Sequence, residues 1–227
     1  MLRLVVLGTG SGVGKTFASA ALLRALAQHN VRSVGLKPIE TGLGEHGATP
    51  PPDSDSALLE HAATEAPPRP HPLYGFRDPI SPHLAARRAN VQIDLAAITK
   101  WVHHNTLQHM PGTVAVIETA GGALSPVAPG ITNLDLAVAL APALWLLVAP
   151  DALGVLHDLS ATLCALRATA RAPDYVLLSA SRPPDASTGT NADELRRLGI
   201  ADPVAVLAAG APNGLEPLVD ALLAARP

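Results

Sequence analysis

The chain has 227 residues, of which 48% are hydrophobic and only 15% are charged, and this balance excludes an intrinsically disordered protein. The net charge of -3 argues against a protein that binds nucleic acid through its phosphates. No apolar run is long enough to predict a secretion signal or a membrane span, and the one cysteine, Cys164, cannot form an intramolecular disulfide. We therefore expect a globular, cytoplasmic protein, in which Cys164 is a small buried residue of a helix.

Strand-like and helix-like segments alternate along the chain. We expect strands over residues 2–7, 33–36, 113–117, 144–148, 175–178 and 203–207, and helices over residues 15–28, 55–63, 95–107 and 158–169. Residues 42–52 and 66–82 are expected as connections, the second either ordered or a flexible lid. The alternation predicts a single α/β domain over residues 1–227, with a mainly parallel sheet flanked by helices on both faces. Ligands are expected at the edge formed by the carboxyl ends of the strands.

A glycine-rich turn joins the first expected strand to the first expected helix, and it reads Gly8-Thr9-Gly10-Ser11-Gly12-Val13-Gly14-Lys15-Thr16. In such a turn backbone N–H groups surround the phosphates of a nucleotide, Lys15 bonds the outer phosphates, and the Thr16 hydroxyl can bind Mg²⁺. The loop is one residue longer than the common pattern, because its outer glycine is Gly8 and the usual glycine position is Thr9. The sequence therefore predicts a protein that binds a nucleoside triphosphate.

Ionisable residues follow the next two expected strands. Lys37 follows the second strand and is either solvated or catalytic, whereas Glu118 closes the third, buried strand. A carboxylate at the end of a buried strand needs a partner or a metal, and Mg²⁺ prefers oxygen ligands. Asp53 or Asp55 could add a second carboxylate or could only cap the helix that begins there. These residues predict a magnesium site beside the glycine-rich loop.

Taken in order along the chain, these motifs resemble those of the dethiobiotin synthetases, which are ATP-dependent ligases of the P-loop superfamily. The loop of that family, Gly-Thr-Asp-Thr-x-Val-Gly-Lys-Thr, has the same extra residue. The other matching elements are Lys-Pro-x-x-(Ser/Thr)-Gly at residues 37–42, Ser-Asp at 54–55, Ser-Pro-His-x-Ala-Ala at 81–86, an acidic residue followed by x-Ala-Gly-Gly at 118–122, and Leu-Gly at 153–154. The Ser-Asp match favours Asp55 over Asp53 as the second carboxylate. The resemblance implies a P-loop NTPase-like three-layer sandwich.

The resemblance also implies an activity. A dethiobiotin synthetase acts on 7,8-diaminopelargonic acid: one amine takes up CO₂ to form a carbamate, ATP phosphorylates the carbamate, and the second amine closes the ureido ring and expels phosphate. Mg²⁺ is the implied cofactor. The implied assembly is a homodimer, in which the start of the helix near residue 154 receives the substrate carboxylate of the other subunit.

The implied site residues fall into four groups. The catalytic residues are Lys15 and Lys37, and the metal ligands are Thr16, Asp55 and Glu118. The nucleotide-binding residues are Gly12, Val13, Gly14, Lys15, Thr16, Phe17, Asp55, Glu118, Thr119, Ala120, Gly121 and Ser179. The substrate-binding residues are Ser11, Thr41, Gly154, Val155, Leu156 and His157.

Three positions depart from the family pattern. The aspartate of the family loop is Gly10 here, and His157 stands where the family commonly has an asparagine at the start of a helix. The asparagine that reads adenine after the fifth strand is also absent, since that segment is Leu178-Ser179-Ala180-Ser181. A hydroxyl or the backbone would then contact the base, and we expect loose base selectivity.

Three alternatives stay open. An amide-forming ligase of the cobyrinate type uses a related loop but normally carries a glutaminase domain, for which this chain is too short. A partitioning ATPase would carry a second lysine early in the loop, where this chain has Thr9, Gly10 and Ser11. A nucleotide-binding relative without activity would fit the loss of the loop aspartate and of the asparagine.

Overall fold

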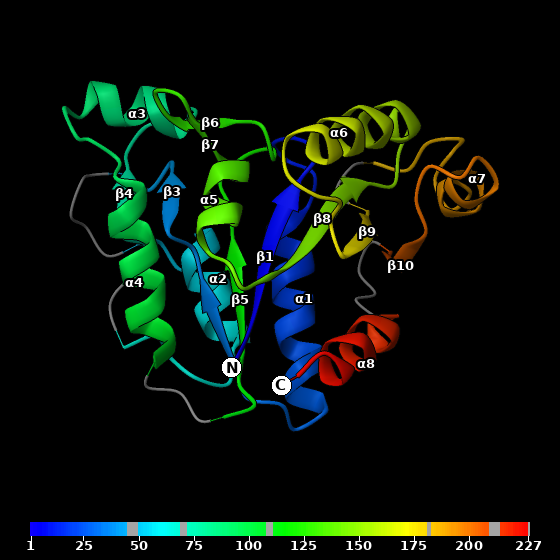
Figure 1. Cartoon of the computed structure of the whole chain (residues 1–227), viewed down its shortest axis with the longest axis horizontal. Helices are drawn as coiled ribbons and strands as arrows, with labels where there is room; N and C mark the ends of the chain where they lie inside the picture. The colour runs from blue at the N-terminus through cyan, green and yellow to red at the C-terminus, as the bar shows by residue number, and fades with distance from the viewer. Residues whose placement is uncertain (45–49, 69–71, 108–110, 181–182, 209–213, 227) are drawn as a thin grey trace.

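A six-stranded parallel sheet forms the centre of the computed structural model, which describes residues 1–44, 50–68, 72–107, 111–180, 183–208 and 214–226 (Figure 1). The strands of this sheet are β1 (Leu2–Gly8), β2 (Ser33–Leu36), β5 (Val114–Glu118), β8 (Leu144–Pro150), β9 (Tyr175–Ser179) and β10 (Pro203–Leu207). Their order is β10-β9-β8-β1-β5-β2, and every pair is parallel. The predicted parallel α/β fold is therefore confirmed, and each strand lies within two residues of its expected range.

The strand order reverses at β1. From β1 the chain crosses to β2 at one edge, returns to β5 beside β1, and then continues on the other side through β8, β9 and β10. Val6 of β1 is paired with Glu118 on one side and with Leu146 on the other. Open α/β sheets bind their ligands in the crevice at such a reversal, outside the carboxyl ends of the strands. The glycine-rich loop follows β1 directly and therefore lies at this crevice.

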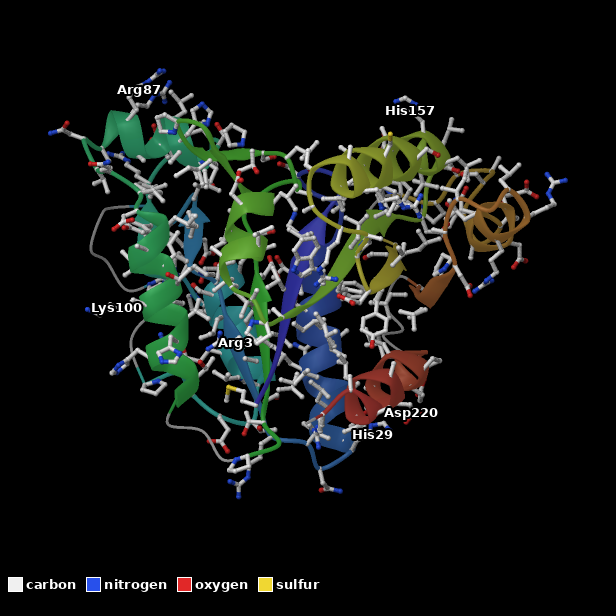
Figure 2. The ribbon with its side chains drawn as sticks, viewed as in Figure 1. Arg3, His29, Arg87, Lys100, His157 and Asp220 are labelled. Atoms are coloured by element: carbon white, nitrogen blue, oxygen red, sulfur yellow. The ribbon has the colours of Figure 1, made fainter. Side chains whose placement is uncertain are left out.

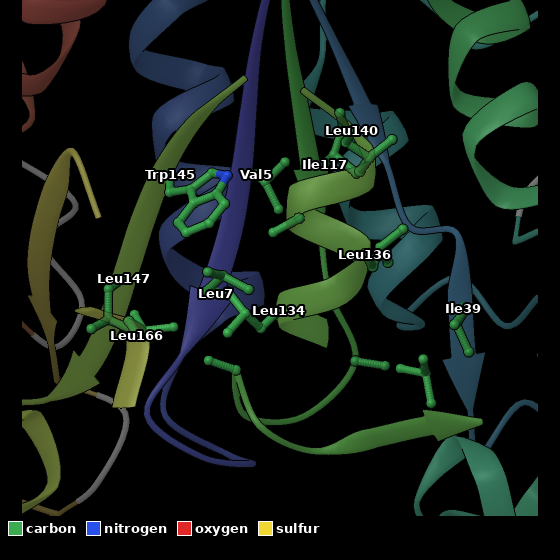
Figure 3. Packing of buried hydrophobic residues seen from close by; sticks show 14 of the residues in the cluster. Val5, Leu7, Ile39, Ile117, Leu134, Leu136, Leu140, Trp145, Leu147 and Leu166 are labelled. Carbon is green, nitrogen blue, oxygen red and sulfur yellow. The ribbon is translucent and has the colours of Figure 1, made fainter. Parts of the chain in front are cut away.

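Helices cover both faces of the sheet. Helices α1 (Lys15–Gln28), α2 (Asp55–Ala62) and α8 (Glu216–Ala224) pack on the face that receives Leu4 and Val6 of β1. The opposite face receives Val5 and Leu7, and it is covered by α3 (Pro82–Arg88), α4 (Leu95–Leu107), α5 (Asn133–Ala139), α6 (Val155–Thr169) and α7 (Asn191–Arg197). Figure 3 shows Val5 and Leu7 beside α5, with Leu147 and Leu166 nearby. Because side chains alternate along a strand, continuous apolar runs such as Leu4–Leu7 build two cores, and the expected three layers follow.

Several short elements differ from the sequence-based expectation. Residues 66–82 were expected as a connection, either ordered or a flexible lid, and no strand was predicted there; β4 (Tyr74–Phe76) lies within them and pairs in parallel with β3 (Ile39–Thr41). Strands β6 (Pro126–Ala128) and β7 (Ile131–Thr132) form a separate antiparallel pair before α5. Residues 69–71 of the expected lid and 45–49 of the first connection lie outside the described residues. Two-residue and three-residue strands carry too little periodicity to be read from the chain alone.

Helix α6 corrects two further expectations. It begins at Val155 rather than Asp158, because Gly154 takes a left-handed conformation, with a φ of +98°, and ends the preceding loop. Its buried face carries Val155, Leu159, Leu163 and Leu166, so Cys164 turns outward and is exposed, not buried as expected. Within the described part of the chain, no helix is long and apolar enough to cross a membrane.

Candidate functional site

The glycine-rich loop carries the chain from β1 into α1. Gly12 and Gly14 have φ angles of +66° and +88°, which side chains other than glycine rarely adopt. A Cβ atom at Gly8 would lie only 3.0 Å from Lys15 Nζ and 2.9 Å from a methyl group of Val13. The Lys15 ammonium donates a hydrogen bond to the carbonyl of Gly10 at 3.1 Å. A side chain at position 8 would therefore crowd the folded-back lysine and the loop backbone, which favours a glycine at this position.

A cavity of about 380 Å³ lies at the carboxyl edge of β1, β2 and β5. It is lined by Ser11, Gly12, Gly14, Lys15, Thr16, Phe17, Lys37, Glu40, Thr41, Asp55, Glu118, Ala120 and Gly121. All of these except Glu40 were named from the sequence as site residues. Segments separated by more than a hundred residues are thus brought to one cavity beside the glycine-rich loop.

Lys37 is the centre of a buried ionic cluster in this cavity. Its ammonium donates to Glu118 Oε1 at 2.5 Å and to Asp55 Oδ2 at 2.7 Å. The same Glu118 oxygen accepts a hydrogen bond from the Thr16 hydroxyl at 2.8 Å. Lys37 is 3% exposed and Glu118 is fully buried, so water screens their interaction very little. Two of the expected metal ligands, Asp55 and Glu118, therefore meet at Lys37, and the third, Thr16, joins the cluster through Glu118.

The two lysines of the cavity have different electrostatic surroundings. Burial and then repulsion by Lys37 lower the pKa of Lys15 to about 8. Burial acts in the same direction on Lys37, but the carboxylates of Glu118 and Asp55 outweigh it and raise its pKa above the ordinary value. Burial also opposes the charge of Asp55, yet Lys37 holds the pKa of Asp55 below its ordinary value. Lys37 is thus a permanent cation, whereas Lys15 titrates near neutral pH.

The oxygen atoms around Lys37 have the chemistry of a magnesium site. Two carboxylates and one hydroxyl come from Asp55, Glu118 and Thr16, and Mg²⁺ binds such hard oxygen ligands together with phosphate oxygens and water. One of these oxygens, Glu118 Oε2, is buried without a hydrogen-bond partner among the described residues. A buried carboxylate oxygen without a hydrogen-bond partner is energetically unfavourable unless a cation binds it. The residues present therefore fit the cation that the sequence predicts.

Some of the expected site residues lie away from the cavity surface. Val13 is buried behind the loop, and the Thr119 hydroxyl donates to the carbonyl of Val6 at 2.8 Å, which holds the end of β5 to β1. Ser179 ends β9 and is fully buried, and its hydroxyl has no hydrogen-bond partner in the described part of the chain. Ser181, in the same segment, lies outside the described residues.

The expected substrate residues at the start of α6 do not line the cavity either. Gly154 is the N-cap of α6, and Val155, Leu156 and His157 form its first turn. Gly154 and His157 are exposed, and Figure 2 shows His157 on the outer side of the helix. The structure therefore separates these four residues from the cavity that holds the other substrate residues, Ser11 and Thr41.

Glu40 is a cavity residue that the sequence analysis missed. It is 4% exposed, and its two carboxylate oxygens accept hydrogen bonds from the backbone amides of Asp55 and Ser56, at 2.6 and 3.1 Å. Burial raises the pKa of its carboxyl group. The available signal was an ionisable residue between two expected site residues, Lys37 and Thr41. The family motif leaves position 40 open, and so it drew no attention to this residue.

Solved structures share the fold at low sequence identity. The signal recognition particle receptor FtsY of Elizabethkingia anophelis matches with a TM-score of 0.57 and 14% identity, over 98% of this chain and 65% of that one. The MinC:MinD cell division complex of Aquifex aeolicus matches with a TM-score of 0.55 and 12% identity, over 98% of this chain and 86% of that one. This chain thus spans less than two thirds of the FtsY chain, and at such identities the likeness concerns the fold alone.

Sequence comparisons are more specific. A family model described as an AAA domain matches residues 2–209. A protein of Anaeromyxobacter dehalogenans strain 2CP-1, named ATP-dependent dethiobiotin synthetase BioD, is 34% identical over 91% of this chain and 90% of its own length. A protein of Mycolicibacterium vanbaalenii with the same name is 35% identical over 73% of this chain and 69% of its own length. The chain therefore belongs to the dethiobiotin synthetase family.

Proposed function

We propose that this protein is an ATP-dependent dethiobiotin synthetase, a ligase that joins 7,8-diaminopelargonic acid and CO₂ into a ureido ring at the expense of a nucleoside triphosphate. The observation that carries the proposal is the buried ammonium of Lys37, held between Asp55 and Glu118 beside the glycine-rich loop. The reaction needs a cation for the carbamate and another group for the phosphates, and Lys37 and Lys15 line one cavity. Relatives that match most of this chain carry this activity in their names.

In the proposed reaction one amine of the substrate attacks CO₂ and loses a proton, which leaves a carbamate anion. Lys37 pairs with this anion, and Lys15 bridges the carbamate oxygen and the γ-phosphate. The carbamate oxygen takes the phosphoryl group, and the second amine then attacks the carbamoyl carbon and expels phosphate. Thr41 and Ser11, which line the same cavity, hydrogen-bond the substrate. The protein acts mainly by positioning the reactants and neutralising their charge, as is usual in phosphoryl transfer.

Thr16, Asp55 and Glu118 are the residues that would hold Mg²⁺. When bound, the ion supplies positive charge to the phosphates during phosphoryl transfer. Lys37 now pairs with both carboxylates, so its side chain would have to leave at least one of them when the metal and the nucleotide bind. The released ammonium is then available for the carbamate. Lys37 would therefore be free to pair with the carbamate only after the metal and the nucleotide have bound.

The nucleotide would lie along the glycine-rich loop and the segment after β5. Its phosphates would contact the backbone from Gly12 to Phe17, and Ala120 and Gly121 would line the side near β5. Thr119 would contribute indirectly, by holding the end of β5 to β1. Ser179 would face the base, since its buried hydroxyl has no partner in the described chain. A lone hydroxyl can donate to one base and accept from another, so we propose loose base selectivity.

We further propose a homodimer in which the start of α6 completes the partner's site. Residues 154–157 do not line the cavity of their own chain, and Leu153 beside them is 79% exposed. The free N–H groups of a helix N-terminus attract an anion such as the substrate carboxylate. We also propose a cytoplasmic location, where an exposed Cys164 stays reduced.

The direct test is an assay of the purified protein with 7,8-diaminopelargonic acid, bicarbonate, Mg²⁺ and each of the four common nucleoside triphosphates. Dethiobiotin, identified by mass spectrometry, should form in step with inorganic phosphate, and with more than one nucleotide. A reaction without bicarbonate is the control and should give no product. Nucleotide binding without dethiobiotin from any of the four nucleotides would contradict the proposal and would favour a relative without this activity.

A further inference from the structure

Glu40 has a surrounding that the proposed reaction does not yet explain. It is the middle residue of β3, where it is paired with Gly75 of β4, and its side chain is buried at the wall of the cavity. A second buried carboxylate, added to that of Glu118 and close to the half-buried Asp55, is unfavourable in a cavity that is to receive a triphosphate. Because burying this carboxylate is unfavourable, we expect Glu40 to have a specific role in the structure or function of the site.

The contacts of Glu40 indicate that contribution. Its oxygens accept from the amides of Asp55 and Ser56, the first two residues of α2. Amides in the first turn of a helix have no partner within the helix, and a carboxylate satisfies them and also interacts favourably with the helix dipole. Glu40 thereby fixes the backbone of Asp55, whose side chain reaches Lys37 at 2.7 Å.

Helix α2 has a second cap that does not touch Asp55. The Ser54 hydroxyl accepts a hydrogen bond from the amide of Ala57 at 3.2 Å, which is the ordinary N-cap interaction. Capping alone is therefore already provided by a neutral residue. Unlike Ser54, the charged Glu40 binds the amide of the very residue whose carboxylate would hold the metal.

We propose that Glu40 is a positioning residue, which holds Asp55 in the orientation that the metal–nucleotide complex requires. The inference rests on the proposed role of Asp55 as a metal ligand. Groups that orient metal ligands without touching the metal commonly change metal affinity or activity by about 10-fold to 100-fold when they are removed. Glu40 should therefore affect metal binding more than it affects nucleotide binding or stability.

The test compares Glu40→Gln with Ser54→Ala, which removes the other cap of the same helix. Mn²⁺ replaces Mg²⁺ and is titrated by electron paramagnetic resonance in the presence of a saturating non-hydrolysable nucleotide analogue. Glu40→Gln has nearly the same shape but presents an NH₂ group to a backbone N–H, so Mn²⁺ affinity should fall by about tenfold or more. Ser54→Ala should keep Mn²⁺ affinity close to wild type, although both variants lose a similar amount of thermal stability.

Glu40→Ala, which removes both acceptor oxygens, should weaken Mn²⁺ binding further than Glu40→Gln. Circular dichroism at the temperature of the titration identifies variants that are folded, and the metal-free affinity for the nucleotide analogue should be unchanged in them. Folded Glu40→Gln with the Mn²⁺ affinity of wild type, or an equal loss in Ser54→Ala, would overturn the inference. Because the readout is metal binding, absence of dethiobiotin formation by the wild type would count against the proposed function and not against the role of Glu40.

Discussion

At the scale of single residues, the two cavity lysines differ in how firmly they hold their positive charge. Lys37 is neutralised by two carboxylates and keeps its charge, whereas Lys15 is buried, lies near another cation and has a pKa of about 8. Triphosphate binding favours a charged lysine. The free protein must therefore take up a proton on Lys15 when it binds a nucleotide at a pH above that value.

Nucleotide affinity should accordingly fall as the pH rises. Below about pH 7 Lys15 is charged in both the free and the bound protein, so it does not make the nucleotide affinity depend on pH. Above about pH 8 the free protein has lost this proton, and the nucleotide affinity should fall by a factor that approaches ten for each pH unit. Isothermal titration calorimetry with a non-hydrolysable analogue measures both the affinity and the proton uptake, when it is repeated in two buffers of different ionisation enthalpy. Affinity that stays constant over this range, without proton uptake, would show that Lys15 is charged throughout.

Removing Lys37 should make stability depend on divalent metal. Lys37→Ala leaves the buried Glu118 carboxylate without a counter-ion, and breaking a buried pair typically costs about 3–5 kcal/mol. Mn²⁺ or Mg²⁺ without nucleotide should restore part of the lost melting temperature in this variant and should affect the wild type much less. Thermal melts with and without metal provide the measurement. Equal responses of the two proteins to metal would mean that Lys37 and the metal do not share the carboxylates.

At the scale of elements, the segment after β5 packs directly on the glycine-rich loop. The amide of Ala123 donates to the carbonyl of Gly8 at 2.7 Å, and a Cβ atom at Gly122 would lie 3.1 Å from the Cα of Gly10. The contact is between two backbones, so neither side can yield by turning a side chain. The loop that would bind phosphates and the segment that follows Glu118 are therefore held as one unit.

This packing makes Gly122 more sensitive to substitution than its neighbour Gly10. Gly122→Ala should lower the free energy of unfolding by about 1–3 kcal/mol and weaken nucleotide binding, because overpacking displaces the loop. A Cβ atom at Gly10 would only make an ordinary contact with Val13 at 3.7 Å, so Gly10→Ala should be neutral or slightly stabilising. Urea denaturation and nucleotide titration of the two variants test the difference. Equal losses in both would contradict a backbone contact specific to Gly122.

Elements differ in how well the sequence predicts them. The long helices and the six strands of the main sheet have strong apolar patterns, and helix 95–107 was found with its cap, Asp94, which accepts from the amide of Ala96. Short strands such as β3 and β4 form because they meet each other in space, which no local pattern encodes. Helix α5 was missed although Thr132 and Asp135 form a capping box at its start, a signal that is visible in the sequence. Glu40 was missed because its role depends on a helix that begins fifteen residues later.

At the scale of the whole molecule, the strand order creates the site. The carboxyl ends of β1, β2 and β5 lie side by side, so the glycine-rich loop, Lys37 and Glu118 meet although they are far apart in the chain. The sequence predicts a parallel sheet and residues at its edge, but it does not give the order of the strands. That order depends on long-range packing of the two cores. The site residues could be grouped without it because the family motifs name residues that share one site.

The proposed dimer leads to a complementation experiment. Lys37→Ala removes the cation of the cavity, and Leu153→Asp adds a negative charge beside the start of α6, where it should repel the substrate carboxylate. Each variant alone should be inactive, whereas a mixture allowed to exchange subunits should regain activity, because one site of the mixed dimer contains both intact parts. Size-exclusion chromatography with light scattering reports the assembly. Mixed dimers without recovered activity, or a monomer that is active, would contradict a shared site.

The measurement that tests the account most directly compares dethiobiotin formation and nucleotide binding in Lys37→Ala and Lys100→Ala. Lys100 is exposed on the outer side of α4 and does not line the cavity, which makes it a control lysine (Figure 2). At saturating Mg²⁺, Lys37→Ala should still bind nucleotide but should lose at least about a hundredfold in turnover, as expected for a group that stabilises charge in the reaction. Lys100→Ala should match the wild type. Near-normal turnover in folded Lys37→Ala would contradict the role given to this buried lysine.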